Sequence, residues 1–190
     1  MDSLEKILKL EVAVGFGRAR FPMSRGSFRY VEKLEWKRTL SADGPRAVNG
    51  GYEWTLKDPV TGERGRLSLT KWRDGVWRLK PELEALGANR YWFEFPAAED
   101  EHIYGCGETF SEFDLKGQRV RIWVAEHQNA KRIGAKMIRE KLLGPRPQRK
   151  LPFEKYESYY VQPTFVSSKR YFVHSTSSAY AEFDLSLIHI

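Results

Sequence analysis

The chain has 190 residues, enough for one domain with a real core and too few for an (β/α)8 barrel, which needs ~250 residues. Its 41% hydrophobic, 14% aromatic and 30% charged residues are typical of a packed globular chain and exclude a disordered one. The net charge is +7, no apolar run approaches the ~20 residues of a membrane-spanning helix, and a single cysteine excludes an internal disulfide.

The N-terminal half shows the period-two alternation of β-strands. The start, Met1 to Lys6, lacks the basic and then apolar pattern of a secretory signal, so we expect a cytoplasmic location. The range 41–51 holds the turn residues Asp43-Gly44-Pro45 and Asn49-Gly50, 58–62 is predicted to be a hairpin loop, and Asp74-Gly75 is a hairpin signal. The strands predicted between these turns are 8–21, 28–36, 52–56, 65–72 and 76–79.

The C-terminal half continues the pattern, with strands predicted at 91–95, 119–125, 159–161, 170–173 and 179–183. One segment differs, because Ile133, Met137, Ile138 and Leu142 recur near helical spacing between Asn129 and Gly144-Pro145. Many short strands with turn punctuation predict a mainly β fold, an antiparallel sandwich or barrel, with one inserted basic helix at about 129–143.

The positive charge is concentrated in and after that helix. Residues 131–150 hold eight basic side chains and one acidic one, which accounts for the whole net charge. Such a segment could attract phosphates, so a small β-rich nucleic-acid or polyanion binder is one alternative function. A solvated helix face explains the same charges.

Two short patterns resemble catalytic motifs and fail as such. Gly105-Cys106-Gly107-Glu108 has no third glycine and no following helix, so we interpret it as a tight bend where two backbones approach each other, not a dinucleotide site. Cys106 has no histidine in a recognised arrangement and is interpreted as a buried small hydrophobe. The four histidines and Cys106 lack metal-ligand spacing, so we expect no metal and no other cofactor.

Acidic and aromatic side chains give further candidates. Asp58 and Glu63, and Glu99 to Glu101, fall in predicted turns and are expected to solvate loops. Glu126 differs, because it follows the apolar segment Ile122 to Ala125, and a strand-end loop is where binding residues concentrate. Most tryptophans occupy alternating strand positions and are expected in the core, although a stacking platform for sugars or bases is the alternative.

Several longer motifs occur in a fixed order: Tyr104-Gly-Cys-Gly-Glu108, Phe113-Asp-Leu-Lys-Gly117, Trp123-Val-Ala-Glu126 and Gln162-Pro-Thr-Phe-Val-Ser167. In this order they resemble the N-terminal β-sandwich of glycoside hydrolase family 31, the α-glucosidase family, and most closely its sulfoquinovosidase-like branch. The resemblance covers about half of the chain strongly and the N-terminal half weakly.

The resemblance implies a galactose mutarotase-like sandwich in front of a catalytic (β/α)8 barrel, whose strand ends carry the nucleophile and the acid/base aspartates of a retaining α-glycosidase. It implies no catalytic residue here and one substrate-binding residue, Glu126, on a loop that reaches the active site. The partner it implies is an α-glycoside held by the barrel, with neither nucleic acid nor membrane involved. The basic helix departs from the family pattern.

The family's sandwich continues past the point where this chain stops. We therefore expect residues 1–185 to form an incomplete sandwich domain and 186–190 to be a non-native tail. On this view the chain alone has no glycosidase activity. A stand-alone carbohydrate-binding sandwich is a third alternative. A reading frame that continues past Asp184 into a barrel would distinguish the glycosidase fragment from such a stand-alone domain.

Overall fold

The computed structural model describes residues 3–24, 27–28, 30–108, 112–124, 141–142 and 160–186. They form antiparallel β-sheets with very little helix, which confirms the predicted mainly β class. The chain divides into two compact units, residues 1–21 with 30–96 (unit 1) and residues 22–29 with 97–190 (unit 2). The predicted helix at 129–143 lies outside the described residues except for Lys141 and Leu142, which are helical, and so does the tail beyond Ser186.

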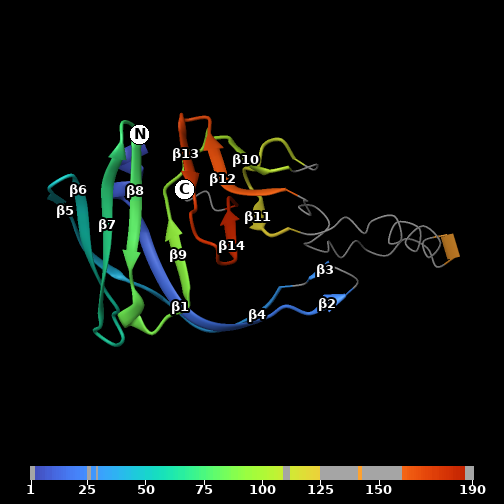
Figure 1. Ribbon diagram of the computed structural model, residues 1–190, viewed down its shortest axis with the longest axis horizontal. Coiled ribbons are helices and arrows are strands. Elements are labelled where there is room, and N and C mark those ends of the chain that lie inside the picture. Colours follow the sequence, from blue (N-terminus) through green and yellow to red (C-terminus); the bar gives the residue numbers. More distant parts are fainter. Residues whose placement is uncertain are drawn as a thin grey trace. The chain divides into compact units, whose positions relative to one another are not determined.

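Unit 1 contains two antiparallel sheets (Figure 1). After helix α1 (Ser3–Leu8), the first sheet has the order β4-β1-β9, with β1 at Glu11–Arg20, β4 at Val31–Thr39 and β9 at Arg90–Glu94. The second has the order β5-β6-β7-β8, with β5 at Ser41–Val48, β6 at Gly51–Lys57, β7 at Arg64–Arg73 and β8 at Val76–Glu82. A 3-10 turn, η1 (Glu84–Leu86), follows β8.

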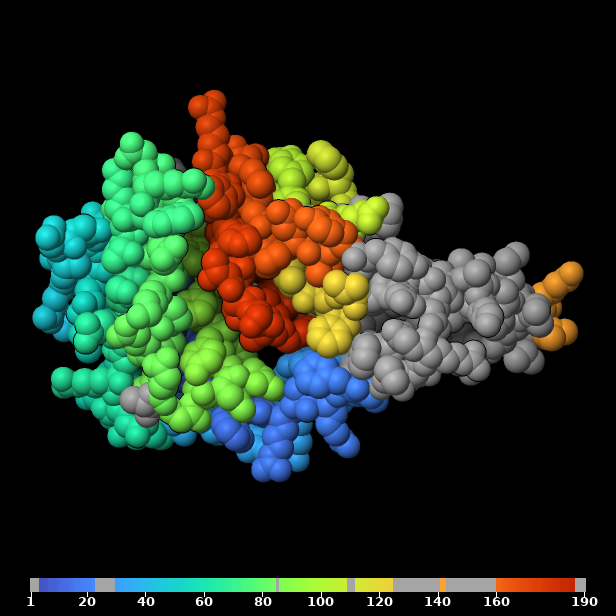
Figure 2. All heavy atoms as spheres, viewed as in Figure 1, coloured from blue at the N-terminus to red at the C-terminus, as the bar shows by residue number. Residues whose placement is uncertain are grey.

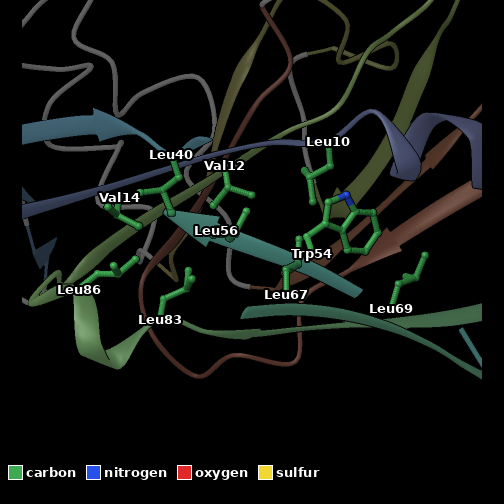
Figure 3. Close-up of a cluster of buried hydrophobic side chains, with 10 residues drawn as sticks. All are labelled: Leu10, Val12, Val14, Leu40, Trp54, Leu56, Leu67, Leu69, Leu83 and Leu86. Atoms are coloured by element: carbon green, nitrogen blue, oxygen red, sulfur yellow. The ribbon is translucent and has the colours of Figure 1, made fainter. Parts of the chain in front are cut away.

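Alternating apolar side chains from both sheets make the core of unit 1 (Figure 3). Strand β1 contributes Val12 and Val14, and β6 and β7 contribute Trp54, Leu56, Leu67 and Leu69. The buried residues of β6 and β7 alternate with more exposed ones, as expected for a sheet with one face on a core and one in solvent. The two sheets therefore pack face to face as a sandwich.

The turn predicted at Asp43-Gly44-Pro45 is wrong, because Ser41–Val48 forms strand β5 on the edge of the second sheet. A β-bulge between Asp43 and Arg46 accommodates Gly44-Pro45. Since a bulge leaves its extra residues outside the ladder, proline's missing N–H costs no strand hydrogen bond there. Only Asn49 and Gly50 form the expected turn.

Unit 2 is built from shorter strands. Its larger sheet has the order β10-β12-β13, with β10 at Ile103–Gly107, β12 at Val161–Ser167 and β13 at Tyr171–His174. A second sheet pairs β11 (Arg119–Ile122) with β14 (Ala181–Asp184), and β2 (Met23–Ser24) pairs with β3 (Ser27–Phe28). Both larger sheets contribute to one core, formed by Ile103, Cys106, Leu115, Val120 and Phe165. Within the described residues, no helix has the length and apolar character needed to cross a bilayer.

Candidate functional site

The strand pair β11–β14 is the element that leads toward the predicted substrate loop. Arg119 lies opposite Asp184 and Arg121 lies opposite Glu182, while Val120 and Phe183 face the core of unit 2. Charged side chains therefore occupy one face of this ribbon and apolar ones the other. This is the alternation expected of a half-buried antiparallel pair.

A ladder of ion pairs connects the charged face. The Arg119 Nε lies 3.0 Å from Asp184 Oδ2 and 3.2 Å from Glu182 Oε1, and the Arg121 Nε donates to Glu182 Oε2 at 3.1 Å. Burial opposes ionisation of Asp184, but hydrogen bonds from Ser186 and Arg119 outweigh it and lower the pKa of that carboxyl. The hydrogen bond to Asp184 likewise raises the pKa of Arg119. Sequence reasoning missed this ladder, although Arg-x-Arg on one predicted strand and Glu-x-Asp at the end of another were its signal.

The ribbon ends at an aromatic pair. The Trp123 and Tyr180 rings lie 5.9 Å apart, tilted by 59°, and the Tyr180 hydroxyl donates to Glu182 at 3.3 Å. Val124 follows with 55% of its surface exposed, so the chain reaches solvent there. The predicted substrate-binding residue, Glu126, is two positions further on and lies outside the described residues.

The Gly105-Cys106-Gly107 segment is the close backbone approach that its glycines predicted. A Cβ on Gly105 would lie 2.8 Å from the Thr164 carbonyl oxygen, and one on Gly107 would lie 2.3 Å from that of Tyr160. Both glycines have φ near +100°, and Cys106 between them has φ of 64°. The register with β12 shifts here, so the motif is a bulge in the β10–β12 pair.

Cys106 is buried, with 1% of its surface exposed, and desolvation raises the pKa of its thiol to about 12. We expect iodoacetamide at pH 8 to alkylate the folded chain at least a hundredfold more slowly than the chain in guanidinium, because the thiolate is the reactive form. Mass spectrometry of quenched samples measures both rates. Fast stoichiometric labelling of the folded chain would instead indicate an activated nucleophile.

Asp114, in the motif Phe113 to Gly117, holds a loop against β10. Its Oδ1 accepts the backbone N–H groups of Ile103 (3.1 Å) and Lys116 (3.0 Å), and its Oδ2 lies 2.6 Å from His102 Nδ1. Burial opposes the charge, yet these hydrogen bonds lower the pKa of Asp114. The loop delivers Leu115 to the core of unit 2. In this motif the aspartate is therefore a structural residue.

Two carboxylates expected to solvate loops are buried instead. Glu101 is 1% exposed and accepts hydrogen bonds from Ser167 Oγ (2.5 Å), from the Tyr171 hydroxyl and from the Ala98 backbone N–H (2.9 Å). Asp58 is fully buried and accepts from Arg38 Nη1 at 2.8 Å and from the Val60 N–H at 2.8 Å. The prediction failed because the donors that make burial tolerable are mostly distant in sequence.

The tryptophans divide between core and surface. Trp54 is 2% exposed in the core of unit 1, as predicted, but Trp72 is 58% exposed at the β7–β8 bulge with the guanidinium groups of Arg73 and Arg78 over its ring. In unit 2, Phe113 is 87% exposed and packs on Tyr104. In the part of the chain that the structure describes, no group of three His, Cys, Asp or Glu side chains could hold a metal ion.

Comparison with known proteins gives matches over most of the chain. A family model described as the glycosyl hydrolase 31 N-terminal galactose mutarotase-like domain matches residues 37–132. The chain is 31% identical over 175 residues to the sulfoquinovosidase of Escherichia coli (strain K12), a match that covers 91% of the chain and 25% of that protein. It is 34% identical over 170 residues to the sulfoquinovosidase of Agrobacterium fabrum (strain C58 / ATCC 33970), covering 90% of the chain and 24% of that protein.

A solved structure has the same fold over nearly the whole chain. It is a GH31 family sulfoquinovosidase from E. rectale in complex with the aza-sugar inhibitor IFGSQ, with a TM-score of 0.67, 24% identity, and coverage of 93% of this chain and 25% of that one. The chain thus spans about a quarter of the length of the relatives it matches.

Proposed function

Because this chain belongs to the glycosyl hydrolase 31 N-terminal galactose mutarotase-like domain family, we propose that it serves a retaining α-glycosidase that hydrolyses O-glycosyl bonds of α-glucosides or α-sulfoquinovosides. One observation carries the proposal. Both curated relatives that match about nine-tenths of the chain, at 31% and 34% identity, are sulfoquinovosidases. Since the chain spans a quarter of each, we assign the hydrolysis to a longer enzyme of which this is the N-terminal sandwich.

Catalysis itself belongs to the barrel in this proposal. A retaining glycosidase needs two carboxyl groups ~5 Å apart on either side of the scissile bond. The deeply buried carboxylates of the described residues, Glu101 and Asp58, are occupied by hydrogen bonds that hold the fold. The half-buried ones on β14 are occupied by arginines. These engagements support a scaffolding role for the sandwich.

Glu126 is the residue that we propose to contact substrate. Its position follows the β11–β14 ribbon, whose ion-pair ladder and Trp123–Tyr180 contact fix the direction of the strand. A strand end whose direction is fixed by such contacts is a suitable base for a binding residue. A carboxylate there accepts hydrogen bonds from sugar hydroxyls.

In the full-length enzyme, Glu126→Gln should lower kcat/KM by about ten- to a hundredfold, because one charge-assisted hydrogen bond contributes roughly 1.5–3 kcal/mol. Hydrolysis should weaken without vanishing, since Glu126 is neither nucleophile nor acid in this proposal. Release of 4-nitrophenol from 4-nitrophenyl α-sulfoquinovoside and α-glucoside measures the effect, and the pair of substrates ranks the two sugars.

Glu99→Gln is the matched control, because Glu99 is an exposed loop carboxylate of the same unit. It should leave both kinetic constants unchanged. Unchanged kinetics for Glu126→Gln would make Glu126 a solvated loop residue. A loss of many orders of magnitude with the fold intact would place catalytic machinery in this domain. Either result contradicts the proposed role.

A further inference from the structure

A polar pocket lies on the outer face of the second sheet of unit 1, opposite the core. Its volume is about 340 Å³, which is large enough for a small ligand. Figure 2 shows the segment that contributes β5 and β6, in cyan and teal, at the surface of this view. The polar side chains that line the pocket come from β5, β6 and β7; they are Ser41, Asp43, Arg46, Thr55, Lys57 and Arg64.

Two cations face each other across this pocket. Lys57 on β6 lies directly opposite Arg64 on β7, in the same row as Ser41 on β5. Side chains directly opposite in an antiparallel pair have Cβ atoms ~5 Å apart, and like charges at that spacing repel. Within the described part of the chain, neither Lys57 nor Arg64 makes an ion pair.

Two neighbouring cations on the same face, Arg66 and Lys80, differ because both have a carboxylate partner. Arg66 lies 3.7 Å from both Glu53 and Glu82, and Lys80 lies 2.9 Å from Glu82. The sheet therefore neutralises the rows next to the pocket with its own side chains and leaves the Lys57–Arg64 row uncompensated.

The remaining polar groups of the pocket do not cancel that charge. The Asp43 carboxylate is 2.5 Å from Arg46 Nη2 and is neutralised by it. Ser41 Oγ donates to the Lys57 carbonyl at 3.2 Å, so its hydroxyl proton is not available to a ligand. Thr55 adds a second hydroxyl. Three cations and one carboxylate give the pocket a net charge of +2.

We propose that this pocket binds a small oxyanion, a sulfate, sulfonate or phosphate group, between Lys57 and Arg64. Guanidinium and ammonium groups donate charge-assisted hydrogen bonds to such oxygens, and an anion between them converts the repulsion of the row into two attractions. The Arg46 guanidinium and the Thr55 hydroxyl supply further donors. The site belongs to unit 1 and does not rest on the proposed glycosidase function.

The test is a titration of the ¹⁵N-labelled 190-residue chain with sodium sulfate up to 20 mM, with sodium chloride keeping the ionic strength constant. We expect saturable amide shifts centred on Lys57 and Arg64 with a Kd of about 1–10 mM, as suits an exposed pair of cations. Glucose 6-sulfate should shift the same amides, whereas glucose should not. If sulfate binds more tightly than glucose 6-sulfate, the ligand is a free anion. If glucose 6-sulfate binds more tightly, the ligand is an anionic sugar.

Lys57→Glu provides a second readout that does not depend on the ligand. It places a carboxylate opposite Arg64, so Tm in sulfate-free buffer should rise by about 1–3 °C while the amide response to sulfate disappears. The control is Lys33→Glu on β4, which makes the same charge change opposite Arg18 in the other sheet and should leave the sulfate titration unchanged.

Three results would overturn the site. Sulfate and chloride could act alike at equal ionic strength, which would leave only screening. The shifts could scatter over basic side chains away from the pocket, which would indicate nonspecific attraction. Glucose could shift the same amides as its 6-sulfate, which would show that the pocket recognises hydroxyls and not an oxyanion.

Discussion

Leu69→Ala should lower the free energy of unfolding of unit 1 by about 3–5 kcal/mol. Leu69 is fully buried on β7, in the cluster that joins the two sheets, and it lies opposite Tyr52 on β6 and Leu79 on β8. Truncation removes three carbon atoms from a packed site and leaves a cavity that strands on both sides keep open. Guanidinium unfolding followed by tryptophan fluorescence measures the loss, because five of the six tryptophans belong to unit 1.

The matched control is Leu34→Ala on β4, where the leucine is 43% exposed. The same atoms are removed from a site already in contact with water, so the free energy of unfolding should fall by less than about 1 kcal/mol. Similar losses for the two variants would mean that the two sheets do not enclose a shared core.

Glu101→Ala should destabilise unit 2 by about 3–5 kcal/mol, an effect as large as that of a core leucine. The carboxylate is buried and accepts hydrogen bonds from Ser167, Tyr171 and the Ala98 backbone, so its removal leaves three donors without their acceptor. Burial, with the hydrogen bond to Glu101, raises the pKa of Tyr171, which keeps the phenol protonated as a donor. Hydrogen exchange of the β12 and β13 amides measures the loss of stability of unit 2.

Two further variants separate the hydrogen bonds from the general loss of a side chain. Glu101→Gln keeps one carbonyl oxygen for the hydroxyl donors but turns an amide toward the Ala98 N–H, so we expect an intermediate loss of about 1–3 kcal/mol. Glu99→Ala, at an exposed position two residues earlier, should be nearly neutral. If Glu101→Ala were as neutral as Glu99→Ala, Glu101 would be a solvated loop carboxylate.

The local sequence pattern was sufficient to predict most of the strands. Alternation at Trp54 and Leu56, and again at Leu67 and Leu69, predicted both β6 and β7 and the side of each that is buried. Asp74-Gly75 predicted the hairpin between β7 and β8, where Gly75 has a φ of 72°. These features depend on residues within a few positions of one another. Strand periodicity and turn residues act over the same short range, so the sequence pattern predicts them.

Local pattern misled at Ser41–Val48, where glycine and proline indicated a turn. Pairing with β6 makes this segment a strand, and a bulge places Gly44-Pro45 outside the ladder. Trp72 was expected in the core on alternation alone. Strand β7 buries Leu67 and Leu69, so Trp72, three positions after Leu69, falls on the opposite face of the strand, where it is 58% exposed.

For the candidate site, the order of motifs was enough to predict the family, which the matched domain over residues 37–132 confirms. The role of each motif residue was not predictable in the same way. Asp114 and Cys106 hold the bulge and loop of unit 2 together, and Glu126, which lies outside the described residues, stays a prediction.

The sequence by itself determined the mainly β class, the hairpins and the family, because these are encoded in side-chain period, turn residues and motif order. Tertiary structure decided which polar residues are buried and which charges go uncompensated. Glu101 finds Ser167 66 residues away, and Lys57 meets Arg64 without a carboxylate while Arg66 has two. Burial of a carboxylate depends on donors brought from distant strands, and a charge is paired or unpaired according to strand register. The burial of a carboxylate and the pairing of a charge therefore cannot be predicted from the neighbouring residues in the chain.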